Sequence, residues 1–406
     1  KSWGSIDMSR LPLTGIRVID ASAVLMGPYA SQWLADFGAE VIKVEPPEGD
    51  STRQTGPTTE RGMSPVFLGV NRNKKSIVID LKKPAGQAAM QALLSCSDVF
   101  MHNIRPQKLA GLGLDSASLR ARYPRLVLAS LLGFHQNGPY GGKPAYDDII
   151  QGMSGNAALV ESQSGTARYF PTVSADKTSG LVAAMAILAA LTQRQTTGEG
   201  SLVEVPMFET MVSFNLVEHF YGAHFEPAQS PAGYPRVLAP WRRPYRTLDG
   251  HVCMMPYTDA HWQRFFTALG ETALAADERF ATMAARTRHI DALYETTGLL
   301  VAKQDTAYWL ALCEKIDVPA ARMNQLADLP QDPHLQATGF FETLEDPAMG
   351  CLRFPGVPVQ FDGQRPPTRM PPRLGADTES VLRQAGVAED QIQRWTTEGA
   401  VGLKPT

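Results

Sequence analysis

The sequence is poor in the residue patterns that hold metal ions or disulfides. Its 406 residues include four cysteines, far apart and never in CxxC spacing, and eight histidines, none in HxxxH or HExxH spacing. The cysteines are Cys96, Cys253, Cys313 and Cys351. These absences argue against a zinc cluster, any other metal site and a disulfide framework, and they favour a reducing, cytoplasmic location.

Three signatures of nucleotide and ester chemistry are also missing. Met26-Gly27-Pro28 stands where a dinucleotide-binding GxGxxG would follow the first expected strand. No GxxxxGK[ST] loop occurs, which argues against P-loop ATP chemistry. No GxSxG occurs, which argues against a serine hydrolase.

Strong charge and long apolar segments are absent as well. The formal net charge is −3 and the pI is about 6.3, so we expect neither nucleic acid nor a membrane as a partner. The longest apolar run, Leu181 to Leu191, is shorter than the roughly 20 residues that cross a bilayer. The start lacks the apolar stretch of a signal peptide, and we interpret residues 1–7, before Met8, as an added segment.

The first half of the chain alternates strand patterns with helix patterns. Strands are expected at 15–20, 40–45, 76–81, 98–101 and 125–132, and helices at 29–37, 84–95 and 119–122. Strands that alternate with helices and are almost wholly apolar are typical of a parallel sheet covered on both faces. The pattern therefore predicts a doubly wound α/β domain.

The composition changes after this region. Residues 225–245 are rich in proline, as in a linker or extended loop. From Thr247 to about Asp317 a hairpin signal, Asp249-Gly250, leads into helices rich in alanine, leucine and aromatic residues. Because 406 residues exceed the usual size of a single core, about 250–300, we expect a smaller second domain here.

Asp176 is the most informative single residue. It lies directly before the apolar run 181–191, at the expected N-terminus of a buried helix, where unpaired backbone N–H groups and the helix dipole favour negative charge. We therefore expect its carboxylate to be ionised at neutral pH and fixed in place, as a carboxylate nucleophile requires. The alternative is a plain helix N-cap, for which Ser174 and Asp176 are both suitable residue types.

Basic and amide side chains follow three successive predicted strands. Lys82 follows the strand ending at Leu81, Asn103 to Arg105 follow the next, and Lys143 lies in the loop after 125–132. Ligands of open α/β sheets bind outside the carboxyl ends of the strands, so this arrangement suits a ligand with several phosphates. The alternative is that surface loops are simply rich in lysine and arginine.

Several segments form a pattern when they are taken together: 13–20, Gly27-Pro28, 38–45, 71–76, 80–82, 103–106, 138–140, Tyr146-Asp147, Gln151, Ser154-Gly155, Asp176, Gly180 and 245–250. In combination, these segments resemble the family III CoA-transferases of the formyl-CoA and carnitine CoA-transferase type. The resemblance runs from about residue 11 to residue 385. Each piece is weak alone, and the combination is specific.

The resemblance implies an interlocked homodimer in which each subunit is a ring threaded through the other. The large Rossmann-like domain would use both chain ends, with a smaller α+β domain inserted between them. The implied division is 8–205 for the first part of the large CoA-binding domain, 206–235 for a linker, 236–326 for the small domain and 327–406 for a second linker and the last part of the large domain.

The resemblance also implies the chemistry. Asp176 matches the family's nucleophilic aspartate, which attacks an acyl-CoA thioester and passes through an acyl–aspartyl anhydride and an aspartyl-CoA thioester. This covalent route conserves the thioester energy, so neither ATP nor a metal is needed. Acyl-CoA and a carboxylic acid would be substrates, and no cofactor would be bound permanently.

The family's CoA contacts carry over by position onto residues near four strand ends. These are Leu25, Met26, Ile79, Lys82, Asn103, Ile104, Arg105, Lys143 and Tyr146. Leu25 stands where a formyl-CoA transferase has glutamine, and Pro46 and Gly111 stand where it has CoA-binding arginines. The glycine-rich lid of that enzyme has no counterpart. These departures count against formyl-CoA and oxalate as substrates.

Two other functions remain open at this point. An α-methylacyl-CoA racemase shares the fold, but it needs a histidine where this chain has Tyr146, and a tyrosine is a poor base at neutral pH. A non-catalytic CoA-binding protein is the other alternative.

Arg242 and Arg243 could meet the second carboxylate of a dicarboxylate, which would suit succinyl-CoA or another dicarboxylyl-CoA as donor, or they could be an exposed basic pair. His135 is interpreted as a lining residue at most.

Overall fold

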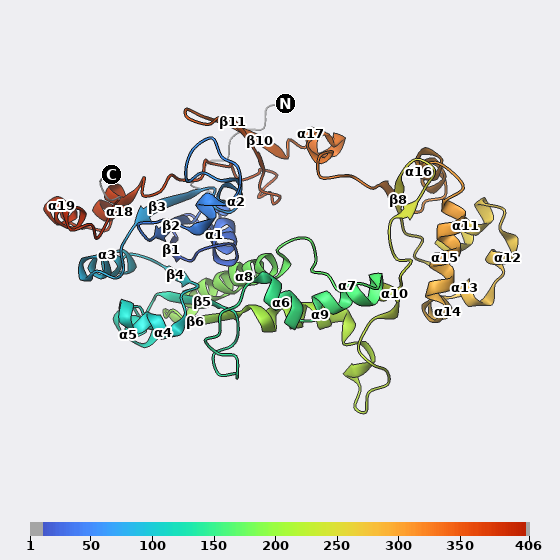
Figure 1. Ribbon diagram of the computed structural model, residues 1–406, viewed down its shortest axis with the longest axis horizontal. Coiled ribbons are helices and arrows are strands. Elements are labelled where there is room, and N and C mark those ends of the chain that lie inside the picture. The colour runs from blue at the N-terminus through green and yellow to red at the C-terminus, as the bar shows by residue number, and fades with distance from the viewer. Residues whose placement is uncertain (1–10, 403–406) are drawn as a thin grey trace. The chain divides into compact units, whose positions relative to one another are not determined.

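The computed structural model describes residues 11–402, so the segment 1–7 that we interpret as added lies outside the described residues. The chain forms two compact units (Figure 1). Unit 1 contains the residues up to Ser154, Pro171–Ser213 and the residues from Pro333 onward. Unit 2 contains Gly155–Phe170 and Phe214–Asp332.

The centre of unit 1 is a six-stranded sheet in which every pair of neighbours is parallel. The strands are β1 (Arg17–Ala21), β2 (Glu40–Glu45), β3 (Lys74–Val78), β4 (Val99–His102), β5 (Val127–Leu132) and β6 (Leu202–Pro206). Their order is β3-β2-β1-β4-β5-β6. The predicted α/β class with a parallel sheet is confirmed. Strand β6 was not predicted, and β3 lies two to three residues earlier than 76–81.

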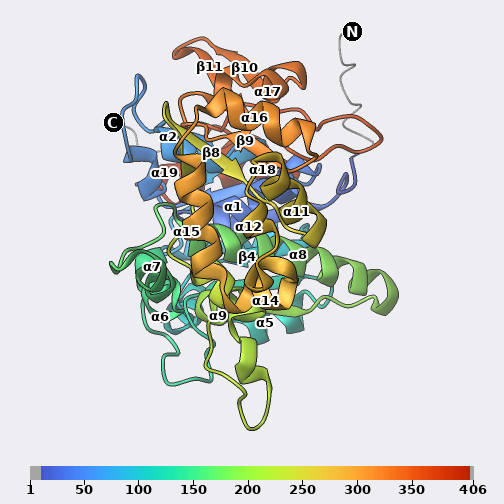
Figure 2. The ribbon, with the colours of Figure 1, turned by 90° about the vertical axis from the view of Figure 1, so that its right-hand side faces the viewer.

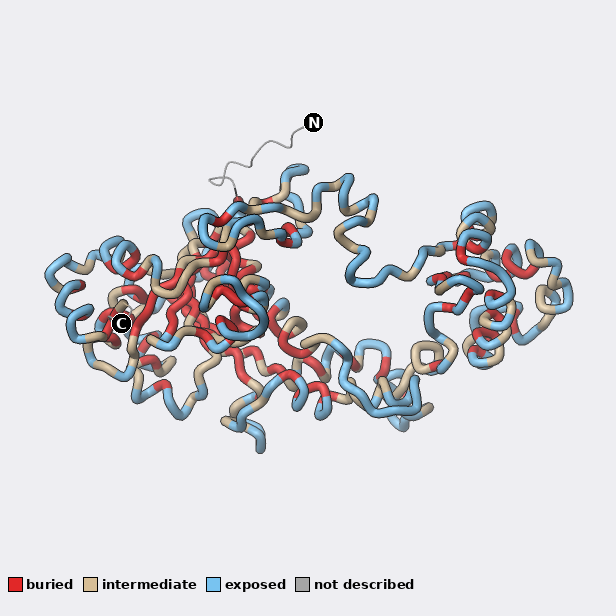
Figure 3. Tube along the Cα trace, turned by 45° about the horizontal axis from the view of Figure 1, so that its top comes forward, coloured by how far each residue is buried: buried red, intermediate tan, exposed pale blue. Residues whose placement is uncertain are grey.

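Alternating side chains of the strands face two apolar cores, one on each side of the sheet. Val18 and Val41 belong to the core beneath α1 (Met26–Asp36) and α8 (Ser174–Thr197). Ile19 and Ile42, the next residues along, belong to the core beneath α3 (Pro84–Leu94) and α5 (Ser116–Arg122). This period of two is what a strand covered on both faces requires. The buried residues of unit 1 concentrate around the sheet (Figure 3).

The last part of the chain completes unit 1. It forms α17 (Pro333–Ala337), the antiparallel pair β10 (Phe341–Asp346) and β11 (Gly350–Pro355), then α18 (Thr378–Gln384) and α19 (Glu389–Thr397). The backbone N–H of Asp377 donates to Ser76 O at 2.9 Å, and that of Gly402 donates to Val78 O at 3.0 Å. Strand β3 therefore uses its outer edge to hold the C-terminal segment.

Unit 2 has a separate core, rich in aromatic side chains, around a three-stranded antiparallel sheet. The strands are β7 (Tyr245–Arg246), β8 (His251–Met254) and β9 (Ala320–Arg322). Helix α16 (Thr306–Lys315) lies beside β8 and β9 (Figure 2). The predicted turn at Asp249-Gly250 is present, with Thr247 N donating to Gly250 O at 3.0 Å.

The remaining elements are short helices and the other helices of unit 2. They are η2 (Ser51–Gln54), α2 (Pro65–Val70), α4 (Pro106–Leu109), η3 (Ala110–Leu112), α6 (Asp147–Met153), α7 (Asn156–Ser164), α9 (Met207–His219), η4 (Tyr221–His224), α10 (Pro235–Leu238), α11 (Asp259–Ala268), α12 (Thr272–Ala275), α13 (Glu278–Ala281), α14 (Met283–Arg288), α15 (Ile290–Val301) and η5 (Leu329–Gln331).

The unit boundaries differ from the predicted domain boundaries in three places: unit 2 includes 155–170, most of 206–235 and 327–332. Helix α7, placed in the large domain by sequence, belongs to unit 2. Gln163 of α7 donates to the carbonyls of Val237 and Arg242 at 3.2 Å, and this contact is not visible in local sequence. The segment 206–235, expected to be a linker, begins with the 13-residue helix α9.

Helix α8 is long and apolar enough to pass a test for a membrane span, among the residues described. Half of its apolar window is buried inside the protein, as in the core helix of a globular domain. The helix exceeds the apolar run 181–191 because it also includes Asp176, Lys177 and Arg194.

Candidate active site

Most of the predicted site residues line one cavity of about 300 Å³ in unit 1, which we call the Asp176 cavity. Its predicted members are Leu25, Met26, Asn103, Arg105, Lys143, Tyr146 and Asp176. The segments that follow β1, β4 and β5 form its walls, at the carboxyl edge of the sheet. Strands β1 and β4 are neighbours although β2 and β3 lie between them in sequence, and ligands of doubly wound folds bind at such a switch point.

Asp176 lies in the first turn of α8 but does not cap it. The helix begins after Val173, which makes no side-chain cap. Instead, Oδ1 of Asp147 accepts hydrogen bonds from the backbone N–H groups of Ala175 at 2.7 Å and Asp176 at 3.0 Å. The other oxygen of Asp147 accepts from Gln151 Nε2 at 2.6 Å. The plain N-cap interpretation of Asp176 is therefore wrong, because a carboxylate from α6 fills that role.

The charge of Asp176 differs from the expectation. Its side chain is buried, with 9% exposed, and accepts no hydrogen bond from the described part of the chain. Burial and, secondly, the nearby charge of Asp147 together raise the pKa of Asp176 to about 7. The prediction of an ionised carboxylate at neutral pH is therefore wrong, because burial disfavours the charge and Asp147 both adds a like charge and takes the helix N–H groups.

A close helix crossing brings the start of α1 to Asp176. A Cβ atom on Gly180 would lie 2.8 Å from the backbone oxygen of Met26 and 3.2 Å from Cδ1 of Tyr29. Glycine at this position therefore allows α8 to approach α1 with no side chain between them. The crossing places Leu25 and Met26 in the wall of the cavity that contains Asp176.

The loop before α1 is held by buried polar groups. Val24 has φ 72°, a left-handed conformation that is unusual for a β-branched residue. Its N–H donates to Asp50 at 3.3 Å, and Asp50 pairs with the buried Lys43 at 2.8 Å. Asn103 accepts from Ala23 N at 3.1 Å and donates to Ala23 O at 2.8 Å. Asn103 therefore supports the cavity wall as well as lining it.

Two cations lie at the Asp176 cavity without a carboxylate partner among residues 11–402: Arg105 and Lys143. The Lys143 ammonium lies 4.9 Å from the ring centre of Tyr140. Gly133 positions its loop, because a Cβ atom there would lie 2.5 Å from Cβ of Ala145. Tyr146, in the same loop, is 69% exposed.

The other predicted contacts line a second cavity of about 620 Å³, which we call the Lys82 cavity. Ile79, Lys82 and Ile104 are in its wall, together with Lys108. Pro46 and Gly111, the two departures from the arginines of formyl-CoA transferase, line it too. The segment 103–108 contributes to both cavities, so a ligand longer than either one could follow this segment from one to the other.

Some residues that the sequence singled out lie outside both the Asp176 cavity and the Lys82 cavity. His135 is not in the wall of the Asp176 cavity, and its Nε2 lies 3.8 Å from Glu204. Arg242 and Arg243 line a cavity in unit 2. Among the described residues, no group of three or more histidine, cysteine or acidic side chains could hold a metal ion. Sequence reasoning missed the capping role of Asp147, whose only signal was its place in the Tyr146-Asp147 motif.

A parallel sheet with a buried carboxylate and two cations at its switch point suits an acyl-CoA enzyme, and residues 13–378 match the family model for CoA-transferase family III. The chain belongs to this family, and it is an enzyme that transfers CoA between acids.

Curated relatives cover almost the whole chain. It is 34% identical over 393 residues to a succinate–glutarate CoA-transferase of Agrobacterium fabrum, covering 93% of this chain and 96% of the relative. It is 30% identical over 399 residues to the beta subunit of a succinyl-CoA–L-malate CoA-transferase of Chloroflexus aurantiacus, covering 94% of this chain and 96% of the relative.

Two solved structures have the same fold. A crystal structure of Rv3272 from M. tuberculosis superposes with a TM-score of 0.78 at 29% identity and covers 90% of this chain and 98% of its own. A crystal structure of a CAIB/BAIF family protein from Brucella suis superposes with a TM-score of 0.77 at 30% identity and covers 92% of this chain and 99% of its own.

Proposed function

We propose that the protein moves CoA from an acyl-CoA thioester to a free carboxylic acid with Asp176 as the covalent nucleophile. The observation that supports this most is the state of that carboxylate. It is buried, accepts no hydrogen bond from the described residues, faces a cavity with two cations, and sits on a helix whose first N–H groups are bound to Asp147. Such a group is free to form a new bond to carbon.

The reaction balances without a metal or a net proton transfer. An oxygen of Asp176 attacks the thioester carbonyl, and CoA leaves as the thiolate, giving a mixed anhydride. The thiolate then attacks Cγ of Asp176, which releases the donor acid and leaves an aspartyl-CoA thioester. The acceptor carboxylate attacks the same Cγ and displaces the thiolate. The thiolate finally attacks the acceptor's acyl carbon, which gives the new acyl-CoA and restores Asp176.

The two cavities in unit 1 suggest how CoA is held. The pantetheine arm and thioester would enter the Asp176 cavity beside Leu25 and Met26, with Arg105 and Lys143 near the diphosphate. The adenosine end would occupy the Lys82 cavity, where Ile79 and Ile104 supply apolar surface and Lys82 a charge for phosphate. Three observations support this placement: the volumes of the two cavities, the wall 103–108 that they share, and the cations without carboxylate partners.

Succinyl-CoA is the donor we propose. The relatives from A. fabrum and C. aurantiacus carry names that pair succinate or succinyl-CoA with glutarate or L-malate, all small dicarboxylates. In these terms the acceptor is another short organic acid. We also propose that the enzyme is an interlocked homodimer of cytoplasmic location that needs no permanently bound cofactor.

Chemical trapping tests the nucleophile. Wild-type protein and Asp176→Ala are incubated with succinyl-CoA, treated with hydroxylamine and digested for mass spectrometry. We expect a hydroxamate on Asp176 in the wild type, none in the variant, and a loss of transfer of at least roughly 10³-fold. Asp148→Asn is the matched control, because Asp148 is an exposed carboxylate next to Asp147.

Circular dichroism and thermal melting establish that each variant is folded. Near-normal transfer by folded Asp176→Ala would refute the nucleophile assignment. Exchange of the substrate's α-proton into deuterated water without acyl transfer would instead identify a racemase.

A further inference from the structure

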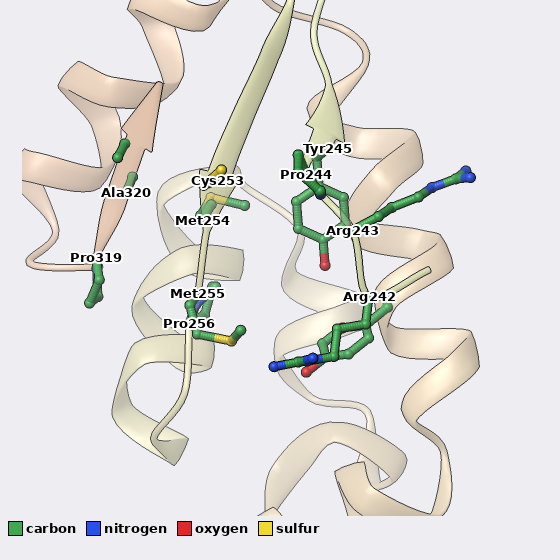
Figure 4. A pocket seen from close by; sticks show the side chains of 12 residues that line it. Arg242, Arg243, Pro244, Tyr245, Cys253, Met254, Met255, Pro256, Pro319 and Ala320 are labelled. Atoms are coloured by element: carbon green, nitrogen blue, oxygen red, sulfur yellow. The ribbon is translucent and has the colours of Figure 1, made fainter. Parts of the chain in front are cut away.

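Unit 2 contains a cavity of about 470 Å³ whose lining shares no residue with the two cavities assigned to CoA, and we call it the Arg242 cavity. Its volume lies within the range of small-molecule sites, about 300–1,000 Å³. The walls are mostly apolar and come from the strands β7, β8 and β9 and their flanks (Figure 4). Its lining includes Tyr245, Cys253, Met254, Met255, Pro256, Tyr294, Pro319 and Ala320.

Arg242 brings a positive charge to this apolar space. Figure 4 shows its guanidinium extending across the cavity toward Met255 and Pro256. It forms no ion pair with any carboxylate of residues 11–402. Hydrogen bonds fix the backbone of Arg242 at both its N–H and its carbonyl. Arg242 N donates to Ala239 O at 2.9 Å, and Arg242 O accepts from Gln163 Nε2 at 3.2 Å. From this fixed backbone, the exposed side chain brings an unpaired guanidinium to an apolar wall, an arrangement suited to an anion.

Arg243 does not share this role. Its guanidinium carbon lies 4.4 Å from the ring centre of Trp241, and Figure 4 shows the side chain directed away from Arg242. Arg236 is engaged as well, because its Nε donates to the hydroxyl of Tyr294 at 3.0 Å. Of this pair, Arg242 therefore faces the cavity, and the two guanidinium groups do not converge on the second carboxylate of a dicarboxylate.

Tyr245 adds a hydrogen-bond donor. Its ring is in the cavity wall, and Figure 4 shows the hydroxyl directed into the space between Arg243 and Arg242. Burial, and secondarily Tyr294, raise the pKa of Tyr245, so the hydroxyl keeps its proton at neutral pH. A guanidinium and a phenol together can hold the two oxygens of one carboxylate.

We propose that the Arg242 cavity binds an organic monocarboxylate with an apolar body, its carboxylate on Arg242 and Tyr245 and its hydrocarbon against Met254 and Met255. Methionine walls adapt to chains of different shape. Each methylene that the cavity buries strengthens binding roughly fourfold, so a medium-chain acid binds more tightly than a short one. This site is independent of Asp176 and of the covalent steps proposed above.

Equilibrium binding without CoA tests the proposal, because no transfer occurs in its absence. Octanoate is titrated into the wild-type protein by calorimetry, with octanamide and succinate as comparison ligands. We expect one octanoate per chain, and binding at least tenfold weaker for octanamide and for succinate. Arg242→Gln weakens octanoate at least tenfold. Arg243→Gln, the matched control with its side chain on Trp241, stays within twofold of wild type.

A local readout establishes where the acid binds. With ¹³C-methyl methionine, octanoate shifts the signals of Met254 and Met255, of which the second is assigned by Met255→Leu. The shifts persist when CoA is saturating. Equal losses in the two arginine variants, equal binding of octanamide, no saturation, or displacement of octanoate by CoA would each overturn the proposal. None of these outcomes bears on whether Asp176 becomes acylated.

Discussion

The surroundings of Asp176 suit the nucleophile that we propose, at a cost to the folded state. An ordinary aspartate is stabilised by water or hydrogen bonds, and both make it a weaker nucleophile. Here the carboxylate is buried beside Asp147, and its pKa rises to about 7. A more basic oxygen attacks carbon more readily. In the proposed mechanism, acylation would also remove one of two like charges from a buried site, and their repulsion would be relieved as the anhydride forms.

This arrangement predicts the pH dependence of acylation. The proposed nucleophile must be ionised to attack, so the single-turnover rate of acylation should rise with pH and level off above about pH 7 to 8. Asp147→Asn removes the neighbouring charge but keeps a side-chain oxygen that can accept from Ala175 and Asp176. Its pH profile should therefore shift to lower pH, with a lower rate at the plateau. Stopped-flow measurement of thiolate release across pH 5–9 gives both profiles.

Asp148→Asn is the control for this experiment, because Asp148 is exposed on the same turn of α6. Its profile should coincide with that of the wild type. An unchanged profile in Asp147→Asn would mean that Asp147 acts only as a cap.

The same pair of carboxylates predicts a stability effect. The pKa of Asp176 is about 7 in the folded chain, against 3.8 for an ordinary aspartate, so the folded chain holds this proton more tightly than the unfolded chain. Its contribution to stability therefore falls as pH rises from about 4 to 7, by a free energy on the order of 4 kcal/mol. Asp176→Asn should raise the melting temperature at pH 8, and the gain should shrink at pH 5. A lower melting temperature at both pH values would contradict a raised pKa of Asp176 in the folded chain.

For single residues, the sequence predicted where a side chain lies better than it predicted its charge or its hydrogen-bond partners. The place of Asp176 at a helix start followed from the apolar run after it. Its charge depended on burial and on Asp147, which is 29 residues away and belongs to another helix. Asn103 was likewise predicted as a ligand contact, whereas its amide also holds Ala23, a partner that only the folded chain brings near.

At the scale of elements, the crossing of α1 and α8 sets the geometry of the site. The two helices meet at Gly180, where the backbone oxygen of Met26 occupies the space of a side chain. Any Cβ at this position must push α1 and α8 apart. Because protein interiors are closely packed, the whole helix would shift rather than a single side chain. Helix separation would move Leu25 and Met26 relative to Asp176.

Gly180→Ala therefore tests the crossing. We expect a loss of about 1–3 kcal/mol in the free energy of unfolding, and a weaker apparent affinity for acyl-CoA together with slower acylation. Gly152→Ala is the control, since Gly152 is also helical and a Cβ there meets nothing within 4 Å. That change should be neutral or stabilise by up to about 1 kcal/mol. Chemical denaturation and initial-rate kinetics measure both effects. Equal behaviour of the two variants would show that the crossing tolerates a side chain.

The order of elements was predictable because strand and helix periodicities differ. The strands β1, β2, β4 and β5 were predicted close to their observed positions, since each is a short apolar run between turn residues. Strand β6 was missed because Leu202 to Pro206 contains a glutamate and a proline and lies at the sheet edge, where burial is incomplete. Helix α9 was missed because the proline-rich residues after it suggested a linker.

At the scale of the whole molecule, both units expose apolar side chains on long helices. Leu181 and Met185, one turn apart on α8, are exposed, and Met185 is 60% accessible. Phe214 and Val217 are exposed on α9. Apolar side chains at helical spacing on a surface are typical of a protein–protein interface. They support the proposed homodimer, a property that the sequence suggested through family resemblance and not through any local pattern.

The dimer prediction is tested by mass and by a single surface charge. Light scattering coupled to gel filtration should give twice the 44.2 kDa chain mass at micromolar concentration. Met185→Lys should reduce the dimer fraction and lower the melting temperature, because a buried unpaired ammonium costs several kcal/mol. Gln193→Lys, which adds the same charge at an exposed polar position of α8, should leave both unchanged. Because a threaded dimer cannot separate without opening one of its rings, dissociation of Met185→Lys should also be slow and coupled to loss of secondary structure. A wild-type mass of one chain, or a Met185→Lys variant that is folded, dimeric and as stable as wild type, would place these side chains outside any subunit interface.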